Sequence, residues 1–229
     1  MTRSGSKLRN LYRSPIGKKI VTGITGLGLT VFVFEHMIGN LKFLFSDAGY
    51  NEYAHFLISF GPLLWIVEIG LLIFVIFHTA VGINIAIGKR RARGTDYLKY
   101  ESAGAPSRQT ISSRSMVVTG AILGVFLVFH LFSFKYGAYY ETTVNGVVMR
   151  DLAALMREKF AHPGYAFGYP AVVLLLALHL RHGIWSAFQS LGATKPSLTP
   201  IIYSIGGLIG LLIAVGFLIV PIAIYFGWV

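Results

Sequence analysis

Four histidines, each inside a different long apolar stretch, are the residues of this sequence best suited to chemistry. They are His36, His78, His130 and His179. Ionisable side chains are costly at membrane depth, so a histidine inside a membrane span marks a candidate functional site. A hydrogen bond to a neighbouring helix would explain one such histidine, but four of them in four stretches require a shared explanation.

Helix geometry sorts these histidines into two depths, because an α-helix rises about 1.5 Å per residue. Counted from the flank nearest the basic loops, His36 and His130 lie about 25 and 24 Å into their stretches. His78 and His179 lie about 16 and 20 Å in from the same side. The sequence therefore indicates two pairs, one at each depth, with their members on different helices.

Two histidines on two helices at one depth are what axial ligation of a haem iron by two imidazoles requires. A neutral imidazole offers one nitrogen lone pair to the iron, and its other ring nitrogen can donate a hydrogen bond to a helix carbonyl. With both axial positions taken by protein, such a haem passes electrons and does not bind oxygen. The sequence contains no cysteine, so the chain cannot attach a c-type haem or hold an iron–sulfur cluster through thiolates.

The elements that would position these histidines are membrane-spanning helices. Of the 229 residues, 55% are hydrophobic, the mean hydropathy is +0.66, and about 20 apolar residues suffice to cross a bilayer. We expect an all-α polytopic membrane protein, with a single transmembrane domain, residues 20–226, after a basic N-terminus, residues 1–19. Its five transmembrane helices, four of them forming a haem-binding bundle, are expected at about 20–45, 62–88, 115–136, 167–191 and 201–226.

The formal charge of +11 is concentrated in residues 1–19 and 89–114. An excess of Lys and Arg marks the cytoplasmic loops of a membrane protein. This pattern predicts a multi-pass protein of the cytoplasmic (inner) membrane, with its N-terminus in the cytoplasm and its C-terminus outside. Membrane lipid is therefore an expected partner, and nucleic acid is not.

Two segments connect the spans on the outer side. Residues 46–61, which carry two acids and no basic residue, are expected to be a loop. Within residues 137–166, apolar side chains recur at helical spacing from Val148 to Phe160, which is typical of a short amphipathic helix on the surface. The histidines of these segments are expected to be structural: His55 and His162.

The fourth span leaves a choice open, because His179 and His182 are three residues apart and share a helix face. Arg181, between them, projects away from His179 by roughly 200°. Its guanidinium could reach a haem propionate or a partner protein, or extend along the helix to the membrane surface. The last span, 201–226, has no charged side chain, and we expect it to pack outside the bundle.

Motifs spread over nearly the whole chain are SPIGKKIVTGITGL, EHMIGNL, NEYAHFL, EIGLLIFVIFHTAVGI, VFLVFHL and LHLRHGIWSAFQSLG. Together they resemble one family, the single-chain, di-haem cytochrome b membrane anchors of succinate:quinone oxidoreductases (succinate dehydrogenases and fumarate reductases). In that family a ligand histidine is followed by a glycine four residues later and an aromatic residue six residues later. His179, Gly183 and Trp185 match this pattern, which favours His179 over His182.

The resemblance implies two b-type haems, the distal one with His36 and His130 as its axial ligands and the proximal one with His78 and His179. This chain would carry the haem and quinone chemistry of the complex, with no dicarboxylate site and no catalytic side chain assigned. A flavoprotein subunit with covalent FAD would interconvert succinate and fumarate. An iron–sulfur subunit would relay its electrons to the proximal haem from the cytoplasmic side.

The resemblance also implies electron exchange with a membrane quinone, menaquinone in our expectation, near the distal haem. Quinone chemistry moves protons, so we expect a carboxylate near the outer end of the bundle. Glu68 is the first candidate by position, followed by Glu52 and Glu35.

Other functions remain open on the residues alone. The chain could be the cytochrome b subunit of another membrane oxidoreductase, such as a hydrogenase or formate dehydrogenase. It could also be a transporter or proton channel whose histidines form a relay, which would make the purified protein colourless. A purely structural membrane anchor would leave the four histidines unexplained.

Overall fold

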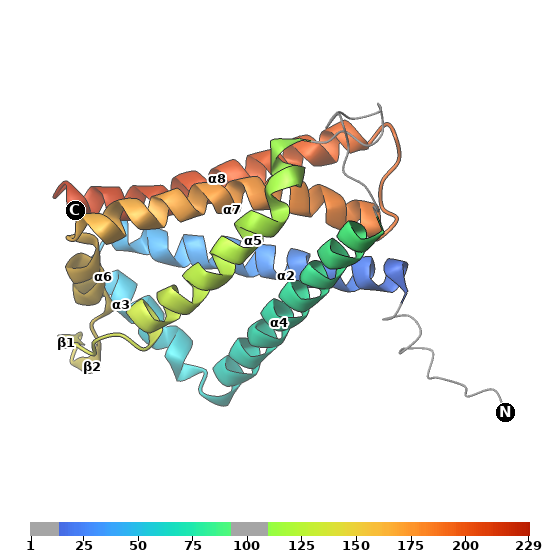
Figure 1. The fold of residues 1–229 in the computed structure, drawn as a ribbon. Helices are drawn as coiled ribbons and strands as arrows, with labels where there is room; N and C mark the ends of the chain where they lie inside the picture. The colour runs from blue at the N-terminus through green and yellow to red at the C-terminus, as the bar shows by residue number, and fades with distance from the viewer. Residues whose placement is uncertain (1–13, 93–109) are drawn as a thin grey trace.

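A computed structural model describes residues 14–92 and 110–229, and five of its helices are long and apolar enough to cross a membrane (Figure 1). The all-α polytopic membrane fold expected from the sequence is therefore confirmed. Residues 1–13 and 93–109, which belong to the two basic segments, lie outside the described residues. The five helices are α2 (Pro15–Leu41), α4 (Pro62–Arg91), α5 (Ile111–His130), α7 (Pro163–Ser190) and α8 (Thr199–Tyr225).

Prolines and polar caps set where these helices begin. Pro15, Pro62 and Pro163 occupy the first turns of α2, α4 and α7, where no backbone N–H is needed. Ser14 caps α2 by accepting a hydrogen bond of 2.9 Å from the backbone N–H of Gly17. Because these signals lie outside the apolar stretches, α2 and α7 begin at residues 15 and 163 rather than at 20 and 167.

Four of the spans surround a common axis, and the fifth lies beside them (Figure 1). α2 packs against α4 and α7, α5 packs against α7, and α4 touches α5. α2 and α5 are therefore diagonal partners, as are α4 and α7, and neither diagonal pair packs closely. α8 packs along α7 and α2, outside this four-helix bundle.

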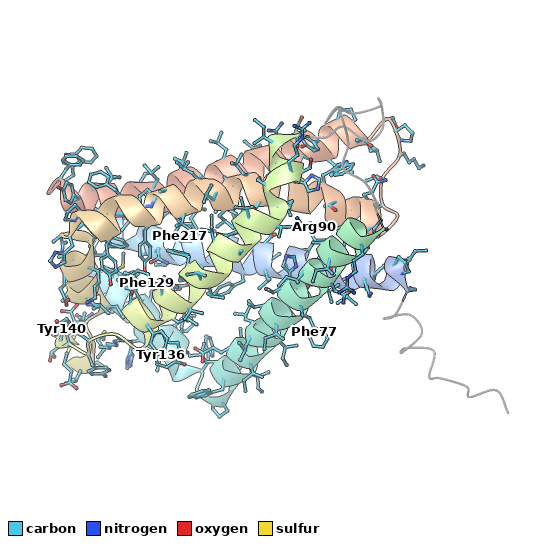
Figure 2. All side chains as sticks on the ribbon, in the orientation of Figure 1. Phe77, Arg90, Phe129, Tyr136, Tyr140 and Phe217 are labelled. Atoms are coloured by element: carbon cyan, nitrogen blue, oxygen red, sulfur yellow. The ribbon has the colours of Figure 1, made fainter. Side chains whose placement is uncertain are left out.

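The two ends of the bundle differ in charge and in cover. At one end, which we call the basic end, α2, α5 and α8 begin and α4 and α7 end. At the opposite end, the capped end, shorter elements cover the bundle. Figure 2 shows Arg90 at the basic end and Tyr136 and Tyr140 at the capped end. The described cations of the basic end are Lys18, Lys19, Arg90, Arg91, Arg114 and Lys195.

The cover of the capped end corrects two expectations. Residues 47–59 form a helix rather than a loop, because Ser46 caps its first turn by accepting a hydrogen bond of 3.1 Å from Gly49. The expected surface helix begins only at Leu152, because the residues before it form a β-hairpin. The elements are η1 (Lys42–Leu44), α3 (Asp47–Ser59), β1 (Glu141–Val144), β2 (Val147–Arg150) and α6 (Leu152–Phe160).

The hairpin turn is made by Asn145 and Gly146, whose backbone φ angles are +52° and +80°. An Asn-Gly pair adopts this left-handed conformation readily and is typical of two-residue hairpin loops. The turn places Val148 on a strand, which ends the helical pattern that the sequence suggested there. In α6 itself, the side chains of Leu155 and Phe160 are buried, as the helical spacing predicts.

Asn51 fastens α3 to α6 at the capped end. Its side chain is buried, and its oxygen accepts a hydrogen bond of 3.0 Å from the backbone N–H of Ala153. Its amide donates a hydrogen bond of 2.9 Å to Asp151, which also caps the first turn of α6. Arg157 of α6 adds a two-pronged ion pair with Asp47 of α3, at 2.7 and 3.0 Å. The short elements are thus joined to each other by buried or paired polar groups.

Candidate functional site

The four histidines inside the spans meet as two pairs, and each pair joins diagonal helices. The rings of His36 on α2 and His130 on α5 have centres 5.7 Å apart, with their planes at 84°. The rings of His78 on α4 and His179 on α7 have centres 6.3 Å apart, with their planes at 62°. Because diagonal helices face each other across the bundle, both pairs lie on its axis.

The two pairs lie at different levels along this axis. At about 1.5 Å per residue, His78 and His179 are about 20 and 17 Å from the ends of their helices at the basic end. His36 and His130 are about 32 and 29 Å from the corresponding ends of theirs. The two levels are therefore about 12 Å apart. We call His78 and His179 the central pair, and His36 and His130 the capped-end pair.

Hydrogen bonds fix the rings of the central pair. Nδ1 of His78 lies 3.2 Å from the carbonyl oxygen of Thr22, and because a carbonyl only accepts, this nitrogen carries the proton. Nδ1 of His179 lies 3.0 Å from the hydroxyl oxygen of Thr119, whose own proton goes to the carbonyl of Ser115 at 2.9 Å. Nε2 of His78 is therefore left with the lone pair, the form that binds a metal, and the contact with Thr119 fixes the orientation of the His179 ring.

Glycines leave room beside the central pair. Gly82 and Gly183 follow His78 and His179 by four residues, on the same helix faces. A Cβ atom at either glycine would meet no other atom within 4 Å. By contrast, a Cβ atom at Gly26 would lie 3.0 Å from Cε1 of His78. The imidazoles thus pack tightly on one side, and the positions one turn away leave the open space that a flat group requires.

Aromatic rings enclose the capped-end pair. His36 stacks on Phe32 at 5.5 Å and also contacts Phe217 of α8 at 5.8 Å between ring centres. Three rings surround His130 at 5.9, 5.5 and 6.0 Å: those of Phe126, Phe134 and Tyr169. The capped-end pair therefore lies in a more apolar setting than the central pair, whose Nδ1 atoms contact oxygen atoms.

The polar contacts of the capped-end pair are fewer and longer. The amide nitrogen of Asn40 lies 3.4 Å from Nε2 of His36, at the limit of hydrogen-bond length. The amide oxygen of Asn40 accepts a hydrogen bond of 3.3 Å from the hydroxyl of Tyr50. Burial raises the pKa of Tyr50, at the capped end, to about 12, so its hydroxyl stays a donor. Nδ1 of His130 is buried and has no hydrogen-bond partner among the described residues.

The helix changes its winding immediately after His130. Leu131–Lys135 form a π-helical turn, and such turns are frequent at functional sites. Arg150 of β2 closes this end of the helix by donating hydrogen bonds of 2.9 to 3.2 Å to the carbonyls of Phe134, Lys135 and Ala138. The hairpin therefore holds the segment that carries His130.

The donor set fits axial ligation of a haem. Within the residues that the structure describes, no three His, Cys, Asp or Glu side chains form a group that could hold a metal ion, so each site offers two imidazoles. Each pair brings together two imidazoles from different helices, with ring centres 5.7 and 6.3 Å apart, and histidine is a common axial ligand of haem iron.

Two neighbours of His179 in the sequence contact other aromatic rings. The ring of His182 packs on Trp185 at 5.6 Å between centres. Arg181 extends over the ring of Tyr203 on α8, with its Cζ atom 5.0 Å from the ring centre. Because α8 lies outside the four-helix bundle, Arg181 points away from the axis on which the histidine pairs lie. The histidines outside the spans lie at the capped end: His55 on α3 and His162 at the start of α7.

The three candidate carboxylates have different surroundings. Glu68 forms an ion pair with Lys135, which joins α4 to the end of α5. Glu52 on α3 accepts a hydrogen bond of 2.6 Å from Asn145 in the hairpin turn. Glu35 is exposed on α2. Glu68 is therefore the carboxylate that links two helices of the bundle.

Sequence reasoning missed the polar partners of the histidines. Thr119 and His179 are 60 residues apart, and no spacing rule connects them. Asn40 follows His36 by four residues on the same helix face, so this contact could have been inferred from the helical period.

Comparisons of this chain with family models, with curated proteins and with solved structures found no match.

Proposed function

We propose that this chain is the di-haem cytochrome b membrane anchor of a succinate:quinone oxidoreductase. In this role it holds two b-type haems and passes electrons between an iron–sulfur partner subunit and a membrane quinone. One observation carries the proposal: four intramembrane histidines face each other as two pairs on the bundle axis, with ring centres 5.7 and 6.3 Å apart. The sequence motifs that resemble this family support it.

In this proposal each histidine pair supplies the two axial ligands of one haem. His78 and His179 serve the haem nearer the basic end, and His36 and His130 serve the other. A bound haem would supply one-electron chemistry. The contacts at Nδ1 orient the central imidazoles, and for His78 the carbonyl of Thr22 leaves Nε2 as the ligating nitrogen. The aromatic rings around the capped-end pair keep water from its imidazoles.

We propose that the quinone reacts near the capped end. The capped-end pair lies about 12 Å beyond the central pair, and Glu68 lies at the same end of α4, paired with Lys135. Glu68 is the carboxylate that we propose to exchange protons with the quinone. The ion pair with Lys135 holds the Glu68 carboxylate in place at this end of the bundle.

The proposed partner subunits dock at the basic end. The central pair is about 17–20 Å from this end, whereas the capped-end pair is about 29–32 Å from it. Electrons from an iron–sulfur subunit would therefore reach the central pair first. The basic side chains of this end suit an acidic protein surface, and the flavoprotein with its covalent FAD would bind on the iron–sulfur subunit.

A histidine relay for protons is less well supported. Proton transfer needs donor and acceptor within hydrogen-bond reach, about 3 Å, or one bridging water. The two pairs are about 12 Å apart along the axis, so no ring of one pair reaches a ring of the other. Within each pair the histidines face each other across the bundle rather than along it.

The test is a reduced-minus-oxidised optical spectrum of the purified protein, with haem quantified per chain, after expression in cells supplied with haem. We expect two b-type haems per chain. His78→Ala and His179→Ala should each lose the same haem, and His36→Ala and His130→Ala should each lose the other. His162→Ala is the matched control, because this exposed histidine lies outside the bundle, and it should keep both haems.

Three results would contradict the proposal in whole or in part. A colourless preparation from haem-supplied cells would remove the cytochrome function and favour the transporter. Loss of haem in the His162→Ala control to the same extent as in the four variants would show general unfolding rather than ligation. Co-purification with a hydrogenase or formate dehydrogenase subunit would keep the haems and reassign the complex.

A further inference from the structure

Arg181 is a cation inside a membrane span that the proposed haem function does not use. It lies on α7 next to the central pair, yet its side chain is exposed and turned toward α8. An arginine at membrane depth normally faces an anion or extends to the interface. The surroundings of Arg181 identify the kind of anion that it can meet.

The side chain runs toward the basic end of the bundle. A Cβ atom at Gly207 would lie 3.9 Å from Cγ and 4.0 Å from Nε of Arg181, so the stem lies along this glycine. The guanidinium lies over Tyr203, one turn nearer the start of α8, with Cζ 5.0 Å from the ring centre. Tyr203 is itself held by a hydrogen bond of 2.9 Å to Thr110, the residue that caps α5.

This direction brings the guanidinium to the level of lipid phosphates. α7 has 28 residues and is therefore about 42 Å long, about 12 Å longer than the hydrocarbon core of a bilayer. If the excess is shared between both ends, each end extends about 6 Å into the head-group layer. Tyr203 lies four residues, or about 6 Å, from the start of α8, so it sits at the boundary between hydrocarbon and head groups.

No carboxylate of the described chain is available to Arg181 at this depth. The sequence has nine Asp and Glu residues; Asp96 and Glu101 lie outside the described residues, and the other seven lie in the half nearer the capped end. The helices α5 and α8 also begin here, and their positive dipole ends add to the positive potential. The seven carboxylates are Glu35, Asp47, Glu52, Glu68, Glu141, Asp151 and Glu158.

An apolar track for an acyl chain continues from Arg181. Leu174 precedes it by seven residues on the same face of α7 and is 52% exposed. On the neighbouring α8, Leu208 is also exposed. A phosphate at the guanidinium would therefore have apolar surface below it, in the direction in which lipid tails run.

We propose that Arg181 and Tyr203 form a binding seat for the phosphate of an anionic phospholipid, in the leaflet at the basic end. Tyr203 holds the guanidinium plane, and the guanidinium donates hydrogen bonds to the phosphate oxygens. A haem propionate is a poorer occupant, because the seat faces α8 and not the bundle axis. A soluble partner is also poorer, because the seat lies at the hydrocarbon boundary. This seat does not depend on the proposed haem function.

The test is native mass spectrometry of the purified full-length chain in neutral detergent, titrated with phosphatidylglycerol or phosphatidylcholine. We expect the wild-type chain to bind phosphatidylglycerol more tightly than phosphatidylcholine. Arg181→Gln should weaken phosphatidylglycerol binding about fivefold, the effect of one basic residue at a membrane surface. Arg181→Lys, which keeps the charge but loses the stacked plane, should weaken it less.

Lys195→Gln is the matched control, because Lys195 is an exposed cation on the connection between α7 and α8, at the same end of the bundle. It should weaken phosphatidylglycerol binding much less than Arg181→Gln does, because Lys195 lies outside the seat formed by Arg181 and Tyr203. Equal losses in Arg181→Gln and Lys195→Gln would overturn the seat in favour of general charge attraction. Equal affinity of the wild-type chain for both lipids would overturn it as well. Inorganic phosphate at millimolar concentration should not compete; competition would assign the seat to free phosphate.

A second variant keeps the proposal open to refutation if Arg181→Gln does not fold. Tyr203→Leu leaves the arginine in place and removes the ring that holds it, so phosphatidylglycerol binding should weaken. Tyr203→Phe keeps the ring and loses only the hydrogen bond to Thr110, so binding should be retained. Unchanged binding in Tyr203→Leu would overturn the proposal.

Discussion

The hydroxyl oxygen of Thr119 lies 3.0 Å from Nδ1 of His179, and it is turned toward that atom because its proton goes to the carbonyl of Ser115 at 2.9 Å. This contact joins α5 to α7 inside the bundle. It fixes the orientation of the His179 ring. Thr119 is therefore the residue through which α5 acts on the central pair.

Replacing Thr119 by valine tests this contact. Valine has nearly the same shape but no acceptor, so Nδ1 of His179 loses its partner and the ring loses its orientation. Partners of this kind typically change metal affinity by about 10–100-fold, so we expect Thr119→Val to lower haem retention at the central pair. The measurement is haem per chain during dialysis against apomyoglobin, with the capped-end haem as internal reference.

Thr119→Ser is the matched control for this variant, because it keeps the hydroxyl. It should retain haem as the wild-type chain does. If serine and valine lose haem to the same extent, the volume of Thr119 matters and its hydrogen bond does not.

Glu68 and Lys135 offer a test of the quinone proposal. A positioned proton donor or acceptor contributes about 10²- to 10⁴-fold to a rate, so Glu68→Gln should lower quinone turnover by about a hundredfold or more, with both haems retained. Turnover would be measured with a water-soluble quinol analogue, alongside haem content.

Glu52→Gln controls for loss of a carboxylate at the same end. The hydrogen bond of Glu52 goes to the hairpin turn. Quinone turnover by the Glu52→Gln variant should therefore be close to that of the wild-type chain. Unchanged turnover in Glu68→Gln would remove Glu68 from the proposed mechanism and leave the haem sites untouched.

Hydropathy was sufficient to predict the five spans, because a bilayer admits long apolar helices and few alternatives. Depth counting placed the histidines at two levels, because the rise of a helix is fixed. In the structure the rings of His36 and His130 meet, as do those of His78 and His179. Whether these rings ligate haem stays a prediction.

The capped end could not be read from the same rules. The spacing from Val148 to Phe160 suggested one helix, but the Asn145–Gly146 turn outweighs periodicity and pairs β1 with β2. The direction of Arg181 was also open in the sequence, because helical phase gives the face of a helix but not which neighbour lies there. The direction of the Arg181 side chain is set by the packing of α8 on α7.

Asn51 provides a test of how the cap is held. Asn51→Ala would leave the backbone N–H of Ala153 and the carboxylate of Asp151 without this partner at a buried site. An unpaired buried polar group costs about 1–3 kcal/mol, so the free energy of unfolding should fall by about that amount. Thermal unfolding in detergent measures this change in the free energy of unfolding.

Asn145→Gly is the control for this variant. It removes an exposed hydrogen bond at a turn where glycine is tolerated, so it should change the free energy of unfolding by no more than about 0.5 kcal/mol. A similar loss in both variants would contradict the role of Asn51.

Gly210 controls how closely α8 approaches α7. A Cβ atom at this position would lie 2.8 Å from the backbone carbonyl oxygen of Ala177, and backbone cannot move aside as a flexible side chain does. Gly210→Ala should therefore push the helices apart and destabilise the protein by about 1–3 kcal/mol, the usual effect of overpacking. Gly70→Ala on α4 is the matched control, because a Cβ atom there meets nothing within 4 Å; it should be neutral or stabilise the helix by up to about 1 kcal/mol. Thermal unfolding of the two variants in the same detergent compares them.

Since the seat of Arg181 lies at the same helix contact, Gly210→Ala should also weaken phosphatidylglycerol binding. Equal stability of the two alanine variants would mean that the contact between α7 and α8 yields easily, and that Arg181 does not depend on it.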